Sequence, residues 1–144
     1  MIRAAALGLL CLPSAATAQI YSPCDDNRSA AFALAEPWTD HTESFADGAV
    51  RLAITDLGKP AAGSFFLVVL APSEEERQCT LVSLDQSMGF ASLTLECSFV
   101  AGDIATGLFF TLPATRWLPD TDTFTYASLS VIVDQSASLT AKLE

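Results

Sequence analysis

Hydrophobic and polar residues alternate along most of the chain after residue 47. The clearest example is segment 126–134, in which Leu129, Val131 and Val133 fall on one side of the alternation. A period of two residues is typical of β-strands, whose successive side chains point to opposite faces. Such segments recur at spacings of 10–15 residues and are separated by Gly, Pro and Asp. The pattern predicts a mainly β protein, a single-domain antiparallel β-sandwich or barrel of about seven or eight strands.

Two segments, 65–70 and 108–110, are apolar on both sides of the alternation. A strand with one face in water should carry polar residues on that face. Something is therefore expected to cover the second apolar face of these segments. The candidates are the N-terminal segment, a second subunit and a ligand. The N-terminal segment is favoured, because Phe32 and Leu34 also need burial. A face left uncovered would predict association, including a homodimer through this apolar face.

Residues 19–46 are expected to form an N-terminal segment that packs on an antiparallel β domain of residues 47–144. Asp25, Asp26 and Asn27 are suitable caps for a short helix over 29–36, which Pro37 would end. A strand that begins at Phe32 is the alternative. Residues 38–45 predict a further strand, joined to the next one through the hairpin dipeptide at 47–48.

The first eighteen residues have the order of a secretory signal peptide. Arg3 supplies the positive start, residues 4–12 are apolar, and Ala16-Thr17-Ala18 is a small-residue cleavage site. The apolar stretch is shorter than the roughly 20 residues that span a bilayer, and no later segment reaches that length. We therefore expect no membrane span. Cleavage near Ala18 would place the protein in the periplasm or outside the cell, where disulfides persist.

The chain is strongly acidic. Residues 1–18 contain one basic and no acidic residue, so the remaining 126 residues carry six Lys or Arg against seventeen Asp or Glu, a net charge of −11. A field of this sign repels nucleic acid and anionic lipid surfaces. It suits a basic protein partner, a cation, or simple solubility.

Three cysteines remain after the predicted leader: Cys24, Cys79 and Cys97. The connection at 85–89 is typical of a turn, and a hairpin about Met88 would set Cys79 opposite Cys97. This predicts a Cys79–Cys97 disulfide, with Cys24 left unpaired or bridging two chains. A competing pattern joins Cys24 to either of the other two and anchors the N-terminal segment.

The chain offers little catalytic chemistry. His41 is the only histidine, and its polar surroundings match no nucleophile motif. One histidine cannot complete a zinc site, and the acidic pairs do not fit a calcium-binding loop. No glycine-rich phosphate loop occurs. We therefore predict no catalytic, cofactor-binding or metal-binding residue, while acidic side chains leave a carboxylate-dependent hydrolase open.

Four residues are candidates for a binding surface: Trp38, Arg116, Trp117 and Tyr126. Aromatic side chains dominate many interfaces, although core packing is their common alternative role. The sequence therefore predicts a small exported acidic β domain that acts as a protein-binding or inhibitor-type module, with a basic envelope protein as the expected partner. A carrier of a small apolar ligand and the carboxylate hydrolase are the alternatives.

Overall fold

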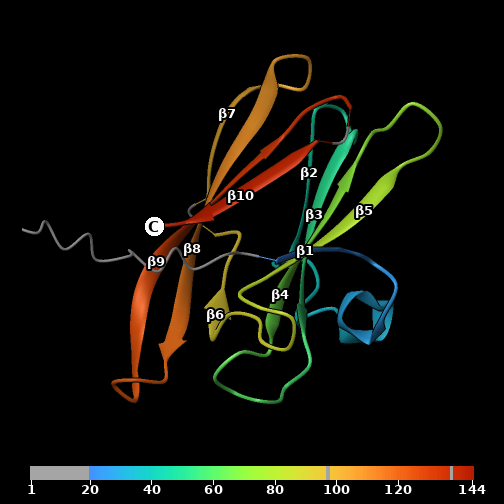
Figure 1. Cartoon of the computed structure of the whole chain (residues 1–144). Coiled ribbons are helices and arrows are strands. Elements are labelled where there is room, and N and C mark those ends of the chain that lie inside the picture. Colours follow the sequence, from blue (N-terminus) through green and yellow to red (C-terminus); the bar gives the residue numbers. More distant parts are fainter. Residues whose placement is uncertain (1–19, 97, 137) are drawn as a thin grey trace, which may run out of the picture.

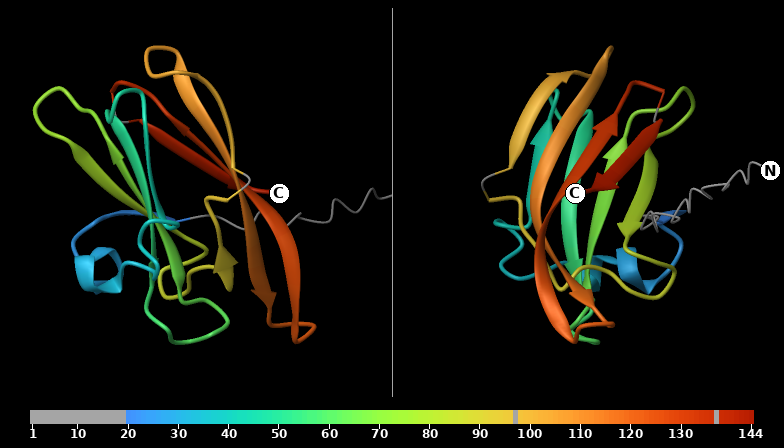
Figure 2. Two further views of the ribbon diagram at one scale, coloured as in Figure 1. Left: turned by 180° about the vertical axis from the view of Figure 1, so that it is seen from behind. Right: turned by 60° about the vertical axis from the view of Figure 1, so that its left-hand side comes forward.

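A computed structural model describes residues 20–96, 98–136 and 138–144. The chain is mainly β and forms two antiparallel sheets, each of five strands in the described ranges. In Figures 1 and 2 the two sheets lie on opposite sides of the molecule, and the helical turns near the N-terminus lie outside the first of them. The predicted signal peptide, residues 1–18, lies outside the described residues. No helix in the described part of the chain is long and apolar enough to cross a membrane.

The first sheet has the order β1-β5-β4-β3-β2. Its strands are β1 (Ile20–Pro23), β2 (Thr42–Phe45), β3 (Val50–Asp56), β4 (Phe65–Ala71) and β5 (Gln78–Ser83). The extra strand predicted within residues 38–45 is thus confirmed as β2, and it pairs with β3 through a turn that contains Asp47 and Gly48. The loop spans residues 46–49 between the paired Phe45 and Val50, and Ala46, Asp47 and Gly48 in it have positive φ.

The second sheet has the order β10-β9-β8-β6, and β7 also pairs with β8. Its strands are β6 (Ser92–Leu93), β7 (Phe99–Asp103), β8 (Gly107–Leu118), β9 (Thr123–Val133) and β10 (Leu139–Leu143). The long β8–β9 hairpin runs the length of the sheet. Pro113 lies within β8, where its carbonyl accepts a hydrogen bond from Thr94 N–H at 3.3 Å. Pro113 therefore does not end the strand.

The two sheets share one hydrophobic core. The predicted inward positions of β9, namely Leu129, Val131 and Val133, are confirmed, since none of them is exposed at all. They belong to the same cluster as buried residues of the first sheet, including Leu52 and Val69. The alternation along each strand therefore directs one apolar face of each sheet toward the other sheet.

Residues of the N-terminal segment lie over the second apolar face of β4. Phe66 and Val68 form a smaller buried cluster with Leu81, on the side of the first sheet away from the main core. The segment over it is not an α-helix, however, but two 3₁₀ turns, η1 (Asn27–Ser29) and η2 (Ala31–Ala33). The expectation that Phe32 is buried is wrong, because its side chain is 80% exposed. Cys24 packs against this cluster instead, together with Arg28, whose guanidinium lies 5.7 Å from the centre of the Phe66 ring.

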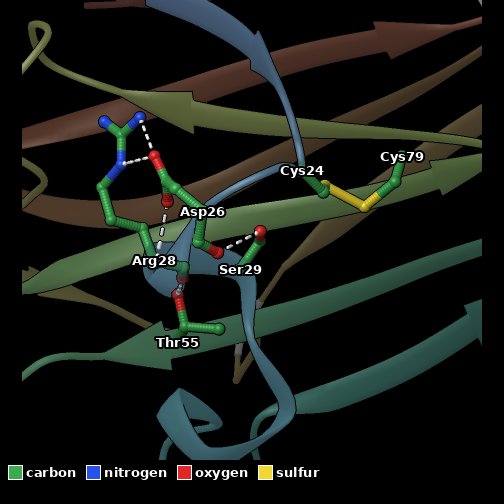
Figure 3. Close-up of a disulfide and its surroundings, with 6 residues drawn as sticks. All are labelled: Cys24, Asp26, Arg28, Ser29, Thr55 and Cys79. Carbon is green, nitrogen blue, oxygen red and sulfur yellow. Dashed lines mark hydrogen bonds and ion pairs between the residues drawn. A yellow bond between two sulfur atoms is a disulfide. The ribbon is translucent and has the colours of Figure 1, made fainter.

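The disulfide joins Cys24 with Cys79, so the predicted Cys79–Cys97 pair and the unpaired or intermolecular Cys24 are both wrong (Figure 3). The turn at 85–89 exists, with Asp85 accepting from the Ser87 and Met88 amides. After it, however, Phe90 bridges to Phe65 of β4, and the chain continues into the second sheet. β5 pairs with β4 on one side and with β1 on the other, and it is β1 that brings Cys24 beside Cys79. Cys97 itself lies outside the described residues.

Candidate functional site

Exposed aromatic and apolar side chains gather on the outside of the second sheet. The register pairs Trp117 with Phe124, Thr115 with Tyr126, and Phe109 with Ile132. Directly opposed residues on antiparallel strands point to the same face, and so do residues two apart on one strand. This face is opposite to the one that carries Leu129 into the core. We call it the outer aromatic face; its members are Phe99, Phe109, Trp117, Phe124, Tyr126 and Ile132.

Four members of this face contact one another in two pairs, and most of its members are exposed to solvent. The rings of Trp117 and Phe124 are 4.8 Å apart, and those of Phe99 and Phe109 are 6.4 Å apart with edge-on geometry. The side chain of Tyr126 is 93% exposed, that of Phe99 60% and that of Phe124 57%. Adjacent exposed apolar residues are typical of interaction sites, whereas single ones are ordinary on protein surfaces.

The two sheets differ in what covers them. The 3₁₀ turn η1 of the N-terminal segment packs on β3 and β4 of the first sheet. None of the described residues forms a comparable layer over β8 and β9. The sequence pattern left open that one apolar face of segment 108–110 is uncovered. That face is the outer aromatic face, which includes Phe109.

The structure brings together only some of the predicted binding residues. Trp117 and Tyr126 share the outer aromatic face, whereas Arg116 alternates to the other side of β8 and lines a neighbouring groove. Trp38 is 58% exposed, but it precedes β2 of the first sheet and is not part of this face. Phe99, Phe109, Phe124 and Ile132 were missed. Phe109, Phe124 and Ile132 lie on the side of β8 or β9 opposite to the core positions. The alternation along these strands could therefore have predicted that they share a face.

Acidic turns lie at both ends of the outer aromatic face. Asp103 is the last residue of β7, at its turn into β8, and Asp134 is in the turn between β9 and β10. Asp120 and Asp122 are in the β8–β9 turn at the opposite end (Figure 1). The amide and hydroxyl of Thr106 donate to Asp103 and lower its pKa. The hydroxyl and amide of Ser136 lower the pKa of Asp134 in the same way. These turns therefore carry negative charge at neutral pH.

A groove of about 410 Å³ adjoins the end of this face that Trp117 occupies. Most of its walls are apolar, but Asp85 also lines it. Burial tends to raise the pKa of Asp85, but hydrogen bonds from Ser87 and Met88 outweigh that effect and lower it overall. The lining residues are Leu84, Asp85, Met88, Arg116, Trp117, Leu118, Pro119 and Asp120.

A second, more polar cavity of about 670 Å³ lies between β2 and the segment that follows β6. It brings His41 together with Asp40, Glu43 and Glu96, a grouping that the sequence did not indicate. All three acidic residues are exposed. A general acid in a hydrolase needs a pKa raised by burial, and these exposed carboxylates lack that burial. Among the described residues, no group of three His, Cys, Asp or Glu side chains is placed to hold a metal ion.

The space between the sheets is filled by large side chains. Phe90, Phe110 and Leu112 have no exposed surface and occupy the region where a carrier of an apolar ligand would need a chamber. A small ligand would therefore have to use the groove beside Trp117. No known protein family matches the chain, and comparisons with curated proteins and with solved structures find no significant match.

Proposed function

We propose that this chain is an exported, non-catalytic binding protein that contacts a basic protein of the cell envelope through its outer aromatic face. In this proposal residues 1–18 are a signal peptide removed near Ala18, and the mature protein acts in the periplasm or outside the cell. Its two sheets form a β-sandwich. The observation that carries the proposal is the outer aromatic face itself, which is left open while the corresponding face of the first sheet is covered.

The charge of the molecule supports a basic partner. The chain after residue 18 has a net charge of −11, and acidic turns flank the outer aromatic face at both ends. Lys and Arg side chains are attracted to such a field, and they also bind favourably over the faces of Trp, Tyr and Phe rings. Two copies of this chain would repel each other, so a different, basic protein fits the face better than a second copy.

Site-specific photo-crosslinking tests this proposal. A benzophenone amino acid at position 126 should capture one protein in an envelope extract, and high salt should suppress the capture. Phe124→Ser should weaken the capture at least tenfold. The matched control is the same probe at position 32, which is also largely exposed but lies on the N-terminal segment.

The outcomes separate the alternatives. Identical products from positions 126 and 32 would contradict the proposed site, and a crosslinked dimer of the chain would replace the basic partner with a second copy. Capture that resists high salt would contradict the electrostatic part of the proposal. A mature N-terminus other than one near Gln19 in the exported protein would contradict the proposed signal peptide.

The groove beside Trp117 favours one second candidate, a carrier of a small apolar ligand. Its mostly apolar walls and its volume of about 410 Å³ are suitable for such a molecule. An environment-sensitive dye should then bind with 1:1 stoichiometry, and Met88→Asp should abolish that binding. Dye binding that is unchanged by this substitution would remove the carrier function.

A further inference from the structure

The Cys24–Cys79 disulfide holds a short segment over a concealed apolar patch. We call residues 24–33 the N-terminal strap. It crosses the outer side of the first sheet (Figures 1 and 3), where Phe66, Val68 and Leu81 are at most 7% exposed. Both cysteines pack against this patch. The patch is separate from the outer aromatic face, which belongs to the second sheet.

The strap itself brings little apolar surface to this contact. Its one large apolar side chain, Phe32, points into solvent and is 80% exposed. The backbone bonds of the strap are mostly local, such as Ala33 N–H to Ala30 O at 2.9 Å. Burial of apolar area is the main source of tertiary stability, so packing of the strap rests mainly on the area of Phe66, Val68 and Leu81 that it removes from water.

A single residue supplies most of the specific polar contacts of the strap. The carbonyl of Arg28 accepts from the Thr55 hydroxyl at 2.6 Å, and its guanidinium donates to the Gln86 carbonyl at 3.0 Å. The same guanidinium covers the Phe66 ring and is held in place by Asp26 (Figure 3). The polar contacts that join this ten-residue strap to the rest of the protein are therefore few.

The ends of the strap are better anchored than its middle. Before it, β1 pairs with β5, and the disulfide continues this ladder by one residue, since Pro23 lies opposite Thr80. After it, Leu34 bridges to Thr55, and Ala35 N–H donates to Ile54 O at 3.0 Å. The disulfide is thus the covalent point that fixes the beginning of the strap against the patch, and both of its cysteines are only half-buried.

We propose that this disulfide is a thiol-sensitive clasp, and that its reduction releases the strap and exposes the patch of Phe66, Val68 and Leu81. The reductant is an external dithiol. One of its thiolates attacks a cystine sulfur, the S–S bond breaks, and a mixed disulfide forms. The second thiol then displaces the protein sulfur. Two electrons and two protons pass to Cys24 and Cys79, and the dithiol leaves as a disulfide.

Hydrogen exchange tests the clasp in the purified chain with and without a dithiol. Cys97→Ser is introduced so that no exchange with this cysteine can occur. In the reduced protein, amide protection in residues 24–33 should fall at least tenfold, while the β8–β9 hairpin keeps its protection. The double variant Cys24→Ser, Cys79→Ser should reproduce the reduced pattern and show no response to the dithiol.

An apolar dye provides a second measurement of the exposed patch. Reduction should raise dye fluorescence several-fold above the constant background of the outer aromatic face. Val68→Thr should diminish this rise without altering the oxidised value. The proposal would be overturned if amide hydrogen exchange in residues 24–33 is unchanged after reduction. A uniform loss of protection in both sheets would also overturn it, because the disulfide would then stabilise the whole fold. Neither outcome bears on binding by the outer aromatic face.

Discussion

The hydroxyl of Tyr21 donates to the carbonyl of Ala141 at 2.5 Å and accepts from the amide of the same residue at 2.9 Å. Tyr21 is in β1 at the edge of the first sheet, and Ala141 is in β10 at the edge of the second. One side chain therefore satisfies both outward-facing backbone groups of a residue 120 positions away. An unpaired edge strand is a template for association with another chain, and this contact closes part of that edge.

Tyr21→Phe removes both hydrogen bonds and leaves two partly buried backbone groups without their partner. We expect the free energy of unfolding to fall by about 1–2 kcal/mol. Urea denaturation measures the change. The matched control is Tyr126→Phe, which removes the same hydroxyl from a side chain that is 93% exposed, and it should leave stability nearly unchanged. Equal effects of the two substitutions would contradict the contact.

Peptide mapping of the non-reduced protein should find Cys24 linked to Cys79. The two residues are 55 positions apart, and closing a loop of that length restricts the unfolded chain. Loss of the bond should lower the free energy of unfolding by at most about 4 kcal/mol. Cys97→Ser should leave this linkage intact. A Cys79–Cys97 peptide would contradict the structure, and would restore the pairing that the sequence favoured.

Neighbouring residues of β9 should respond very differently to truncation. Leu129→Ala removes a fully buried side chain from the shared core and should cost about 2–5 kcal/mol of stability. Ile132→Ala trims a side chain of the outer aromatic face that is 45% exposed, and it should cost less than about 1 kcal/mol. Thermal or urea unfolding compares the two. A larger effect at Ile132 would mean that the outer face is buried in the protein as studied.

Asp134 should make stability depend on pH in the acid range. Hydrogen bonds from Ser136 and Ser138 lower its folded-state pKa below the ordinary value of 3.8. The unfolded chain therefore binds the proton more readily. The stabilisation is present above about pH 4 and is lost as the pH falls through the folded-state pKa.

Unfolding midpoints measured between pH 5 and 2.5 test this dependence. The profile of Asp134→Asn should be flatter than that of the wild type. Gln135→Ala changes an exposed residue of the same turn without touching a carboxylate, and it should keep the wild-type profile. A profile that is equally steep in Asp134→Asn would assign the acid sensitivity to other groups.

Much of the strand structure was predictable because it depends on local patterns. Alternation placed Leu129, Val131 and Val133 inside, and Asp47-Gly48 marked a hairpin turn, since both rules concern residues that are close in sequence. The cap at Asp26 was predictable for the same reason, because its carboxylate accepts from the amide of Arg28 two residues later. The helix expected after it forms only as 3₁₀ turns.

By itself the sequence determined which side of each strand is apolar, where the chain turns, and that the molecule is acidic. Only the tertiary structure decided which strands are neighbours. Cys79 and Cys97 flank a real turn, yet the chain leaves β5 for the other sheet, so β1 supplies the partner cysteine. The tertiary structure also decided that the outer aromatic face is exposed, because the N-terminal strap lies over the first sheet and not over the second. Local periodicity reflects the geometry of one strand, whereas pairing and cover depend on contacts between residues that are distant in sequence.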